Sequence, residues 1–219
     1  MGTESIEASF LSMFALISFF IFLLVSKYSH RIKSGALLDK EFSKPQAFHE
    51  FPITRSGGIA VIISLSIFFI IYYLLYAKIL YDYIFISYSV FLIGFLDDMR
   101  INIKPMRRLV IMALLIFTFT LILPIKIFNI DIPFFTTLMS NHIFSSIFVL
   151  FCFLFIINGA NLIDGFNGLL TINLIIINII LTYININNGN LEFSILLISQ
   201  IIILLSFLLF NFPSAKIFL

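Results

Sequence analysis

Residues 58–77 read GIAVIISLSIFFIIYYLLYA, twenty consecutive residues without a charged side chain. A helix of about 20 mostly apolar residues crosses the hydrocarbon core of a bilayer. The rest of the chain has the same character, because 61% of its 219 residues are apolar and only 11% are charged. A soluble globular domain is about a quarter charged. The sequence therefore predicts an integral membrane protein in contact with membrane lipids, and no nucleic-acid partner is expected.

Seven apolar segments of this kind are spread along the chain. Backbone polar groups in hydrocarbon must be bonded internally, so we expect each segment to be a helix. The predicted fold is all-α, a polytopic transmembrane bundle in which residues 1–219 form a single integral membrane domain. The predicted spans are residues 8–26, 58–77, 79–96, 109–128, 143–157, 169–184 and 193–212.

The basic residues indicate which side of the membrane each loop faces. The segments after the first, third, fifth and seventh predicted spans hold eleven of the thirteen Lys and Arg residues. Cytoplasmic loops collect Lys and Arg. We therefore expect the N-terminus outside and the loops at 27–57, 97–108 and 158–168 inside. Since no Lys or Arg precedes the first apolar run, we expect no cleavable signal peptide.

Two adjacent carboxylates lie at the inner end of the third predicted span, where residues 94–98 read GFLDD. Asp97 and Asp98 repel each other and are costly to desolvate at a membrane boundary. A divalent cation or a basic partner would relieve both costs, and carboxylate oxygens suit Mg²⁺. The alternative is a solvated helix end with Arg100 or Lys104 as a neighbour.

A second polar block, NGANLIDGFNGL, occupies residues 158–169 on the same predicted side. Its glycines permit positive φ and close approach of a ligand. Asn158, Asn161 and Asn167 offer donors and acceptors for sugar, base or phosphate oxygens, and Asp164 adds a carboxylate. We expect a tight polar loop between two membrane helices. The alternative is a simple Asn-rich turn in a chain that is rich in Asn.

The first inner loop contains a third block, PQAFHEFPITRSGG, at residues 45–58. Arg55 is followed by two glycines at a predicted helix start, an arrangement typical of an anion site. His49 could carry a proton, but a hydrogen-bonding loop residue is the preferred interpretation. Lys104, Arg107 and Arg108 follow the aspartate pair, and they either hold phosphate or belong to the ordinary positively charged collar.

Together, the three blocks resemble the polyprenyl-phosphate N-acetylhexosamine-1-phosphate transferases, glycosyltransferase family 4. That family includes enzymes that start O-antigen, enterobacterial common antigen and teichoic-acid synthesis, and the phospho-MurNAc-pentapeptide translocase. The resemblance implies that a lipid phosphate attacks the β-phosphorus of a UDP-sugar, so that UMP leaves. It implies Mg²⁺, with Mn²⁺ as the alternative ion. It also implies Asp97, Asp98 and Asp164 as catalytic and metal-binding residues. The implied substrate-binding residues are His49, Arg55, Lys104, Arg108, Asn158, Asn161 and Asn167.

The resemblance also implies partners and a location. The substrates would be a UDP-sugar and polyprenyl phosphate, at the cytoplasmic face of a bacterial inner membrane, in the first step of a cell-envelope polysaccharide such as O-antigen. The Pro-x-x-Arg-x-Gly-Gly form that ends at Gly58 is similar to the GlcNAc-1-phosphate branch. A homodimer is compatible with the sequence.

Two departures from the family pattern stand out. Many relatives have Asp where this chain has Asn167, so hydrogen bonding is the expected role there, not proton abstraction. Relatives also have more spans, and after a segment like residues 212–219 they continue with Gly-Asp-x-Gly, whose Asp is implied to bind the metal. We therefore expect this chain to be the N-terminal part of the family fold, as a fragment or a truncated gene product, and an open reading frame that continues with Gly-Asp would restore the full enzyme interpretation.

Two other functions stay open at this point. One is a truncated, inactive relative that binds lipid phosphate without turnover. The other is a non-enzymatic component of a transport system, which would place ionisable residues within the spans. The predicted spans are nearly free of charge, and the acidic residues of the three blocks lie at one side, which favours chemistry at a membrane surface.

Overall fold

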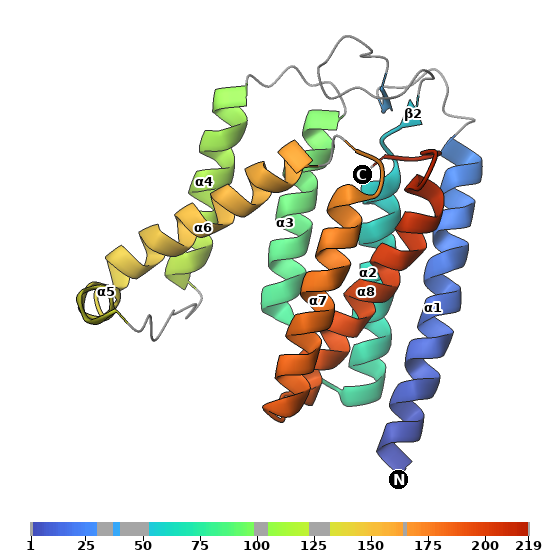
Figure 1. Ribbon diagram of the computed structural model, residues 1–219, viewed down its shortest axis with the longest axis horizontal. Coiled ribbons are helices and arrows are strands. Elements are labelled where there is room, and N and C mark those ends of the chain that lie inside the picture. The colour runs from blue at the N-terminus through green and yellow to red at the C-terminus, as the bar shows by residue number, and fades with distance from the viewer. Residues whose placement is uncertain are drawn as a thin grey trace. The chain divides into compact units, whose positions relative to one another are not determined.

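The computed structural model describes residues 2–29, 37–39, 53–98, 105–122, 132–163 and 166–218. Within these ranges the chain is mainly helical, and two short strands precede the second helix (Figure 1). The elements in chain order are α1 (Gly2–Ser29), β1 (Leu38–Asp39), β2 (Ile53–Thr54), α2 (Gly57–Tyr76), α3 (Tyr81–Asp98), α4 (Pro105–Ile122), α5 (Pro133–Met139), α6 (His142–Ile163), α7 (Leu169–Asn187) and α8 (Leu191–Asn211).

Five helices in the described part of the chain are long and apolar enough to cross a membrane. They are α1 from Glu7 onward, α2, α6 as far as Ala160, α7 and α8. Helix α3 adds a shorter apolar stretch, Tyr81–Leu96, and α4 has 18 residues. The prediction of an all-α, polytopic membrane protein is confirmed. The count of seven spans and the outside location of the N-terminus stay predictions.

One detail of the sequence prediction is wrong, and one short helix was not predicted. The polar loop predicted at 158–168 is helical in its first half, because α6 continues to Ile163. The side-chain amide nitrogen of Asn158 donates to the carbonyl of Leu154, 2.7 Å away, so this polar residue is accommodated within the helix. The predicted outer loop between the fourth and fifth spans contains a helix, α5, which begins at Pro133. Proline suits this first helical position because its fixed φ is helical.

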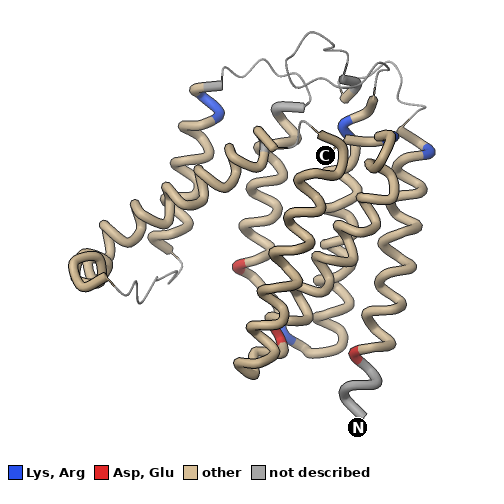
Figure 2. The backbone as a smooth tube through the Cα atoms, in the orientation of Figure 1, with Lys and Arg blue, Asp and Glu red and all other residues tan. Residues whose placement is uncertain are grey.

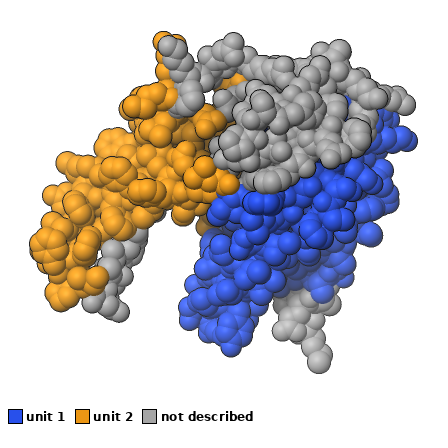
Figure 3. Space-filling view, turned by 45° about the horizontal axis from the view of Figure 1, so that its top comes forward, with its two compact units in different colours: residues 1–80, 163–219 blue, residues 81–162 orange. Residues whose placement is uncertain are grey.

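The chain divides into two compact units, which Figure 3 shows in different colours. Unit 1 contains residues 1–80 and 163–219, and unit 2 contains residues 81–162. The expectation of one integral membrane domain over residues 1–219 stays a prediction.

Unit 1 is a bundle of α1, α2, α7 and α8, in which α8 packs against the other three. Helices α1 and α8 run in one direction, and α2 and α7 run in the opposite direction (Figure 1). One end of the unit, which we call the motif end, therefore holds the ends of α1 and α8 and the starts of α2 and α7. The loops predicted to be inside around Arg55 and Asn167 both reach this end of unit 1.

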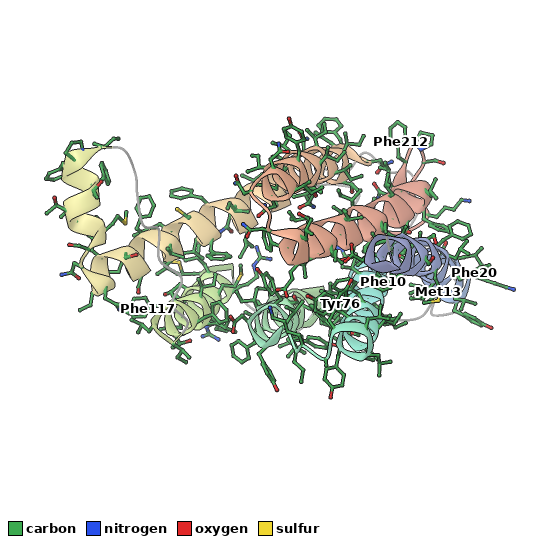
Figure 4. The ribbon with its side chains drawn as sticks, turned by 90° about the horizontal axis from the view of Figure 1, so that it is seen from below. Phe10, Met13, Phe20, Tyr76, Phe117 and Phe212 are labelled. Carbon is green, nitrogen blue, oxygen red and sulfur yellow. The ribbon has the colours of Figure 1, made fainter. Side chains whose placement is uncertain are left out.

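Aromatic side chains form the core of unit 1. Phe10 and Phe14 of α1 pack against Phe68 of α2, with ring centroids 5.9 and 5.6 Å from it. Phe22 of α1 packs against Phe207 of α8, 6.1 Å away. Phe10 lies on the side of α1 that faces α2, whereas Met13 and Phe20 lie on its outer side (Figure 4). Helices in lipid associate through such close packing, because lipid tails are as apolar as the side chains.

In unit 2, the start of α3 packs against the end of α4. The rings of Phe85 and Phe119 stack with centroids 5.8 Å apart and planes 6° apart. Phe85 lies near the start of α3 and Phe119 lies in the last turn of α4, so the two helices are antiparallel. The end of α3 and the start of α4 consequently lie at the same end of unit 2.

Within the described residues of unit 1, the charged side chains lie at the two ends of the helix bundle (Figure 2). Lys27, Arg55 and Lys216 lie at the motif end, in the last turn of α1, before α2 and after α8. At the opposite end, Lys78 forms an ion pair with Glu192 in the first turn of α8. This pair links the end of α2 to the start of α8.

We expect Glu192→Gln to cause a small loss of thermal stability at neutral pH. The effect is small because both partners are more than half exposed, at 52% and 63%. The hydrogen bond to Glu192 raises the pKa of Lys78 above its ordinary value of 10.5. Stabilisation from a raised Lys pKa is present at neutral pH and is lost as the pH rises through that pKa. Thermal unfolding of both proteins in detergent checks this, and a stability difference that persists well above pH 10.5 would contradict it.

Candidate active site

In unit 2, the candidate residues lie at the junction between α3 and α4. Asp97 and Asp98 are the last two residues of α3, and Arg107 and Arg108 lie in the first turn of α4. Acidic residues are unfavourable at the C-terminal end of a helix, where the macrodipole is negative. The positions of Asp97 and Asp98 therefore cost stability unless a cation compensates them. Folding alone does not account for the pair.

Helical geometry also separates the two aspartate positions. Successive residues of an α-helix are rotated by about 100°, so positions 97 and 98 lie on different faces of α3. One ligand is therefore expected to be reached best from only one of them. The arrangement suits two carboxylates with different partners.

Asn158 and Asn161 lie near the end of α6, three residues apart and so on one face of that helix. The Asn158 amide nitrogen is engaged by the carbonyl of Leu154, which orients the side chain. The turn between α6 and α7 is therefore shorter than the sequence predicted. Its polar residues divide between the last turns of a helix and a five-residue connection, residues 164–168.

In unit 1, Arg55 lies between β2 and the start of α2 and is half-buried. Strand β2 pairs with β1 in antiparallel fashion, and the Arg55 N–H donates to the carbonyl of Leu37 at 2.8 Å. On its other side, Thr54 of β2 bridges Ile217 in parallel fashion. We call residues 212–218, which follow α8, the tail. Arg55 thus directly follows a strand, β2, that pairs with β1 on one side and with the tail on the other.

Gly57 lets the tail approach the start of α2. Its N–H donates to the carbonyl of Phe218 at 2.7 Å, and the Phe218 N–H donates to the carbonyl of Thr54 at 2.9 Å. A Cβ at position 57 would lie 2.5 Å from the Phe218 oxygen and 2.8 Å from a ring carbon of Phe207. From the sequence, we expected this glycine to leave space for a bound anion beside Arg55. In the structure, the space beside it is filled by the tail.

The turn before α7 is also attached to the tail. Gly168 has φ +77°, a conformation that glycine adopts without strain, and its N–H donates to Oδ1 of Asn211 at 2.6 Å. The side-chain nitrogen of Asn167 donates to the carbonyl of Pro213 at 3.1 Å. Sequence reasoning missed Asn211. Its signal was weak: one Asn at the end of an apolar run, in a chain with many Asn residues.

The remaining predicted site residues lie wholly or partly outside the described part of the chain. His49, Lys104 and Asp164 lie outside the described residues, as do the side chains of Asp97, Asp98 and Asn161. The described geometry groups the predicted residues within each unit. Arg55 and Asn167 share the motif end of unit 1, and the aspartate pair shares one end of unit 2 with Arg108.

The motif end of unit 1 is suited to bind anions. Helices α2 and α7 begin there and α1 and α8 end there, so two positive and two negative ends of helix dipoles lie at this end, and the dipoles largely offset one another. Lys27, Arg55 and Lys216 add formal positive charge. Phosphate groups bind well at helix N-termini that are accompanied by Arg or Lys.

Comparison with known proteins gives the family. The sequence profile of glycosyl transferase family 4 matches residues 80–219, which include the end of α3, the end of α6 and the tail. This chain belongs to glycosyl transferase family 4. The family 4 profile thus covers Asp97, Asp98, Arg108 and the block at 158–169, and it confirms the resemblance inferred from these motifs.

Curated family 4 relatives share up to about a third of the aligned residues. A phospho-N-acetylmuramoyl-pentapeptide-transferase from Streptococcus thermophilus (strain CNRZ 1066) is 34% identical over 137 residues, which cover 58% of this chain and 40% of the relative. The protein of that name from Clostridium perfringens (strain 13 / Type A) is 30% identical over 135 residues, covering 58% of this chain and 43% of the relative. The chain therefore spans about two fifths of the length of these relatives.

Proposed function

We propose that the protein transfers a sugar-1-phosphate, GlcNAc-1-phosphate, from a UDP-sugar to a polyprenyl phosphate and releases UMP. Membership of glycosyl transferase family 4 supports the transfer. The observation that carries the proposal is the pair Asp97 and Asp98 at the C-terminal end of α3, where the helix dipole opposes their negative charge and a cation would compensate it. We place the reaction at the cytoplasmic face of a bacterial inner membrane, in the first step of a cell-envelope polysaccharide.

The proposed roles follow from the chemistry of the residues. Asp97, Asp98 and Asp164 are the candidate ligands of the ion, because hard carboxylate oxygens are the donors that Mg²⁺ prefers, and Mn²⁺ fits the same donors. The bound ion would neutralise charge on the pyrophosphate. The aspartate of the pair that does not bind the ion takes the proton of the lipid phosphate and so makes it a better nucleophile. Its position on a different face of α3 is consistent with this division of roles.

The other residues bind and orient the substrates. Arg55, Lys104 and Arg108 would hold phosphate oxygens, which suits Arg because its planar group donates two parallel hydrogen bonds. Asn158, Asn161 and Asn167 would hydrogen-bond the nucleotide sugar. His49, in the first inner loop, would contribute a further hydrogen bond to the substrate. Such positioning accounts for much of the catalysis in phosphoryl transfer.

The direct test is UMP release by the full-length protein in membranes, with UDP-GlcNAc, polyprenyl phosphate and Mg²⁺. We expect release to require both substrates, to stop when EDTA removes the metal and to resume when Mg²⁺ or Mn²⁺ is restored. Membranes without the protein are the control. Lipid-phosphate binding without UMP release from any UDP-sugar would overturn the proposal in favour of a non-catalytic relative.

The sugar has a second candidate. The curated relatives are named for phospho-N-acetylmuramoyl-pentapeptide, and this favours UDP-MurNAc-pentapeptide as the donor. The Pro-x-x-Arg-x-Gly-Gly form of the first inner loop favours UDP-GlcNAc. The same assay with the two donors in parallel decides between them by the ratio of their kcat/KM values.

A further inference from the structure

Asn211, the last residue of α8, joins two segments of unit 1 through one buried side chain. It is only 4% exposed. Its Oδ1 accepts from the N–H of Gly168 at 2.6 Å, and its Nδ2 donates to the carbonyl of Ile217 at 3.1 Å. Both polar atoms of the amide are therefore used, one by the turn before α7 and one by the tail.

The tail continues this connection to the first inner loop. Ile217 bridges Thr54 of β2, and the neighbouring Phe218 bonds to Thr54 and Gly57. A second amide supports the same attachment, because Asn167 donates to the carbonyl of Pro213. A chain of hydrogen bonds thus runs from the start of α7, through Asn211 and the tail, to the strand before Arg55.

We propose that Asn211 is a positioning residue, which holds the turn before α7 in place relative to β2, the strand that directly precedes Arg55. In its catalytic consequence this inference rests on the proposed function, since Asn167 and Arg55 were there assigned to the nucleotide sugar and to phosphate. Asparagine suits the task because its planar amide offers an acceptor and a donor side by side. A leucine has neither, and an ionised aspartate has only acceptors.

Two variants separate positioning from bulk packing. Asn211→Leu keeps the approximate volume and removes both hydrogen bonds. Asn211→Asp keeps the acceptor for Gly168 but sets a second carboxylate oxygen against the Ile217 carbonyl. Protonation of the introduced carboxyl converts that oxygen into a donor and restores both bonds. A carboxyl is increasingly protonated as the pH falls, and a buried carboxyl takes up its proton at a higher pH than an exposed one, whose ordinary pKa is about 4.

The kinetic measurement is UMP release by the folded, monodisperse full-length protein. We expect Asn211→Leu to lower kcat/KM on the order of 10-fold, through a higher KM for the UDP-sugar and an unchanged KM for the lipid phosphate. We expect Asn211→Asp to show the same defect at a pH high enough to ionise the introduced carboxyl and to regain activity, relative to wild type, as the pH is lowered. Asn211→Leu should not regain it. Equal KM values for all three proteins, or no pH-dependent recovery, would overturn the proposal.

A second measurement does not depend on catalysis. Hydrogen exchange of a peptide spanning residues 166–170 reports the Gly168 amide, and we expect faster exchange in Asn211→Leu than in wild type at the same pH. The matched control is Asn173→Leu, because Asn173 is exposed and bonds only to Leu169 of its own helix. If wild type releases no UMP but the exchange difference is present, the proposed function fails and the attachment through Asn211 stands. Unchanged exchange in Asn211→Leu overturns the attachment itself.

Discussion

Asp97→Asn and Asp98→Asn are each expected to lower UMP release by on the order of 100-fold or more, with little effect on folding. Asn keeps the shape of the side chain but removes the charge that would hold a cation or take a proton. Both residues end α3, where a negative charge opposes the helix dipole. Removing either charge should therefore leave the melting temperature unchanged or raise it slightly. Activity and thermal stability are measured on the same preparations.

Asp82→Asn is the matched control for these two variants. Asp82 lies in the first turn of the same helix, at the opposite end, and is exposed. An acidic residue at this end is favoured by the dipole, so its loss should cost a little stability and no activity. These effects on stability and activity are thus the reverse of those expected for Asp97→Asn and Asp98→Asn. Wild-type turnover by both Asp97→Asn and Asp98→Asn would remove the basis of the proposed mechanism.

Much of the helical architecture could be predicted from the sequence, because in lipid an apolar run of sufficient length has few alternatives to a helix. Residues 58–77 predicted a span that the structure gives as Gly57–Tyr76. The helix ends were less predictable. The end of α6 was misplaced because Asn158 and Gly159 suggested a turn, whereas the Asn158 side chain bonds to its own helix and the helix continues to Ile163.

The sequence motifs of the candidate site could be recognised from the sequence, but the residues that hold those motifs in place could not. Asp97, Asp98 and Arg108 were chosen as candidates because charges are rare in this chain and stand out at the ends of apolar runs. Asn211 was missed, since its importance depends on burial and on two partners, Gly168 and Ile217, of which one lies 43 residues away. Long-range hydrogen bonds leave no local pattern in a single sequence. Gly57 was noticed, but the space beside it was assigned to a ligand and not to the tail.

The tail is the feature of unit 1 on which both motif segments depend. It pairs with Thr54 on one side and receives hydrogen bonds from Asn167 and Asn211 on the other. Any change that displaces it should disturb the first inner loop and the turn before α7 together. The most direct such change is at Gly57, because that residue is enclosed by backbone and by an aromatic ring.

We expect Gly57→Ala to destabilise the protein by about 1–3 kcal/mol, the usual cost of overpacking a filled site. The new Cβ would lie 2.5 Å from the Phe218 oxygen, a backbone atom that can move only if the tail moves. UMP release by the protein that remains folded should fall as well, since the displaced tail no longer holds Thr54, the residue before Arg55. Thermal unfolding in detergent and the UMP assay measure the two effects.

Gly94→Ala is the control for stability. Gly94 lies inside α3, and beyond its own helix backbone and chain neighbours a Cβ there meets no atom of the described residues within 4 Å. Because alanine favours a helix over glycine by up to about 1 kcal/mol, this variant should be as stable as wild type or more stable. The two substitutions add the same methyl group, so the difference between their melting temperatures isolates the contact with the tail. Equal stability of Gly57→Ala and Gly94→Ala would show that the tail does not pack against α2 as described.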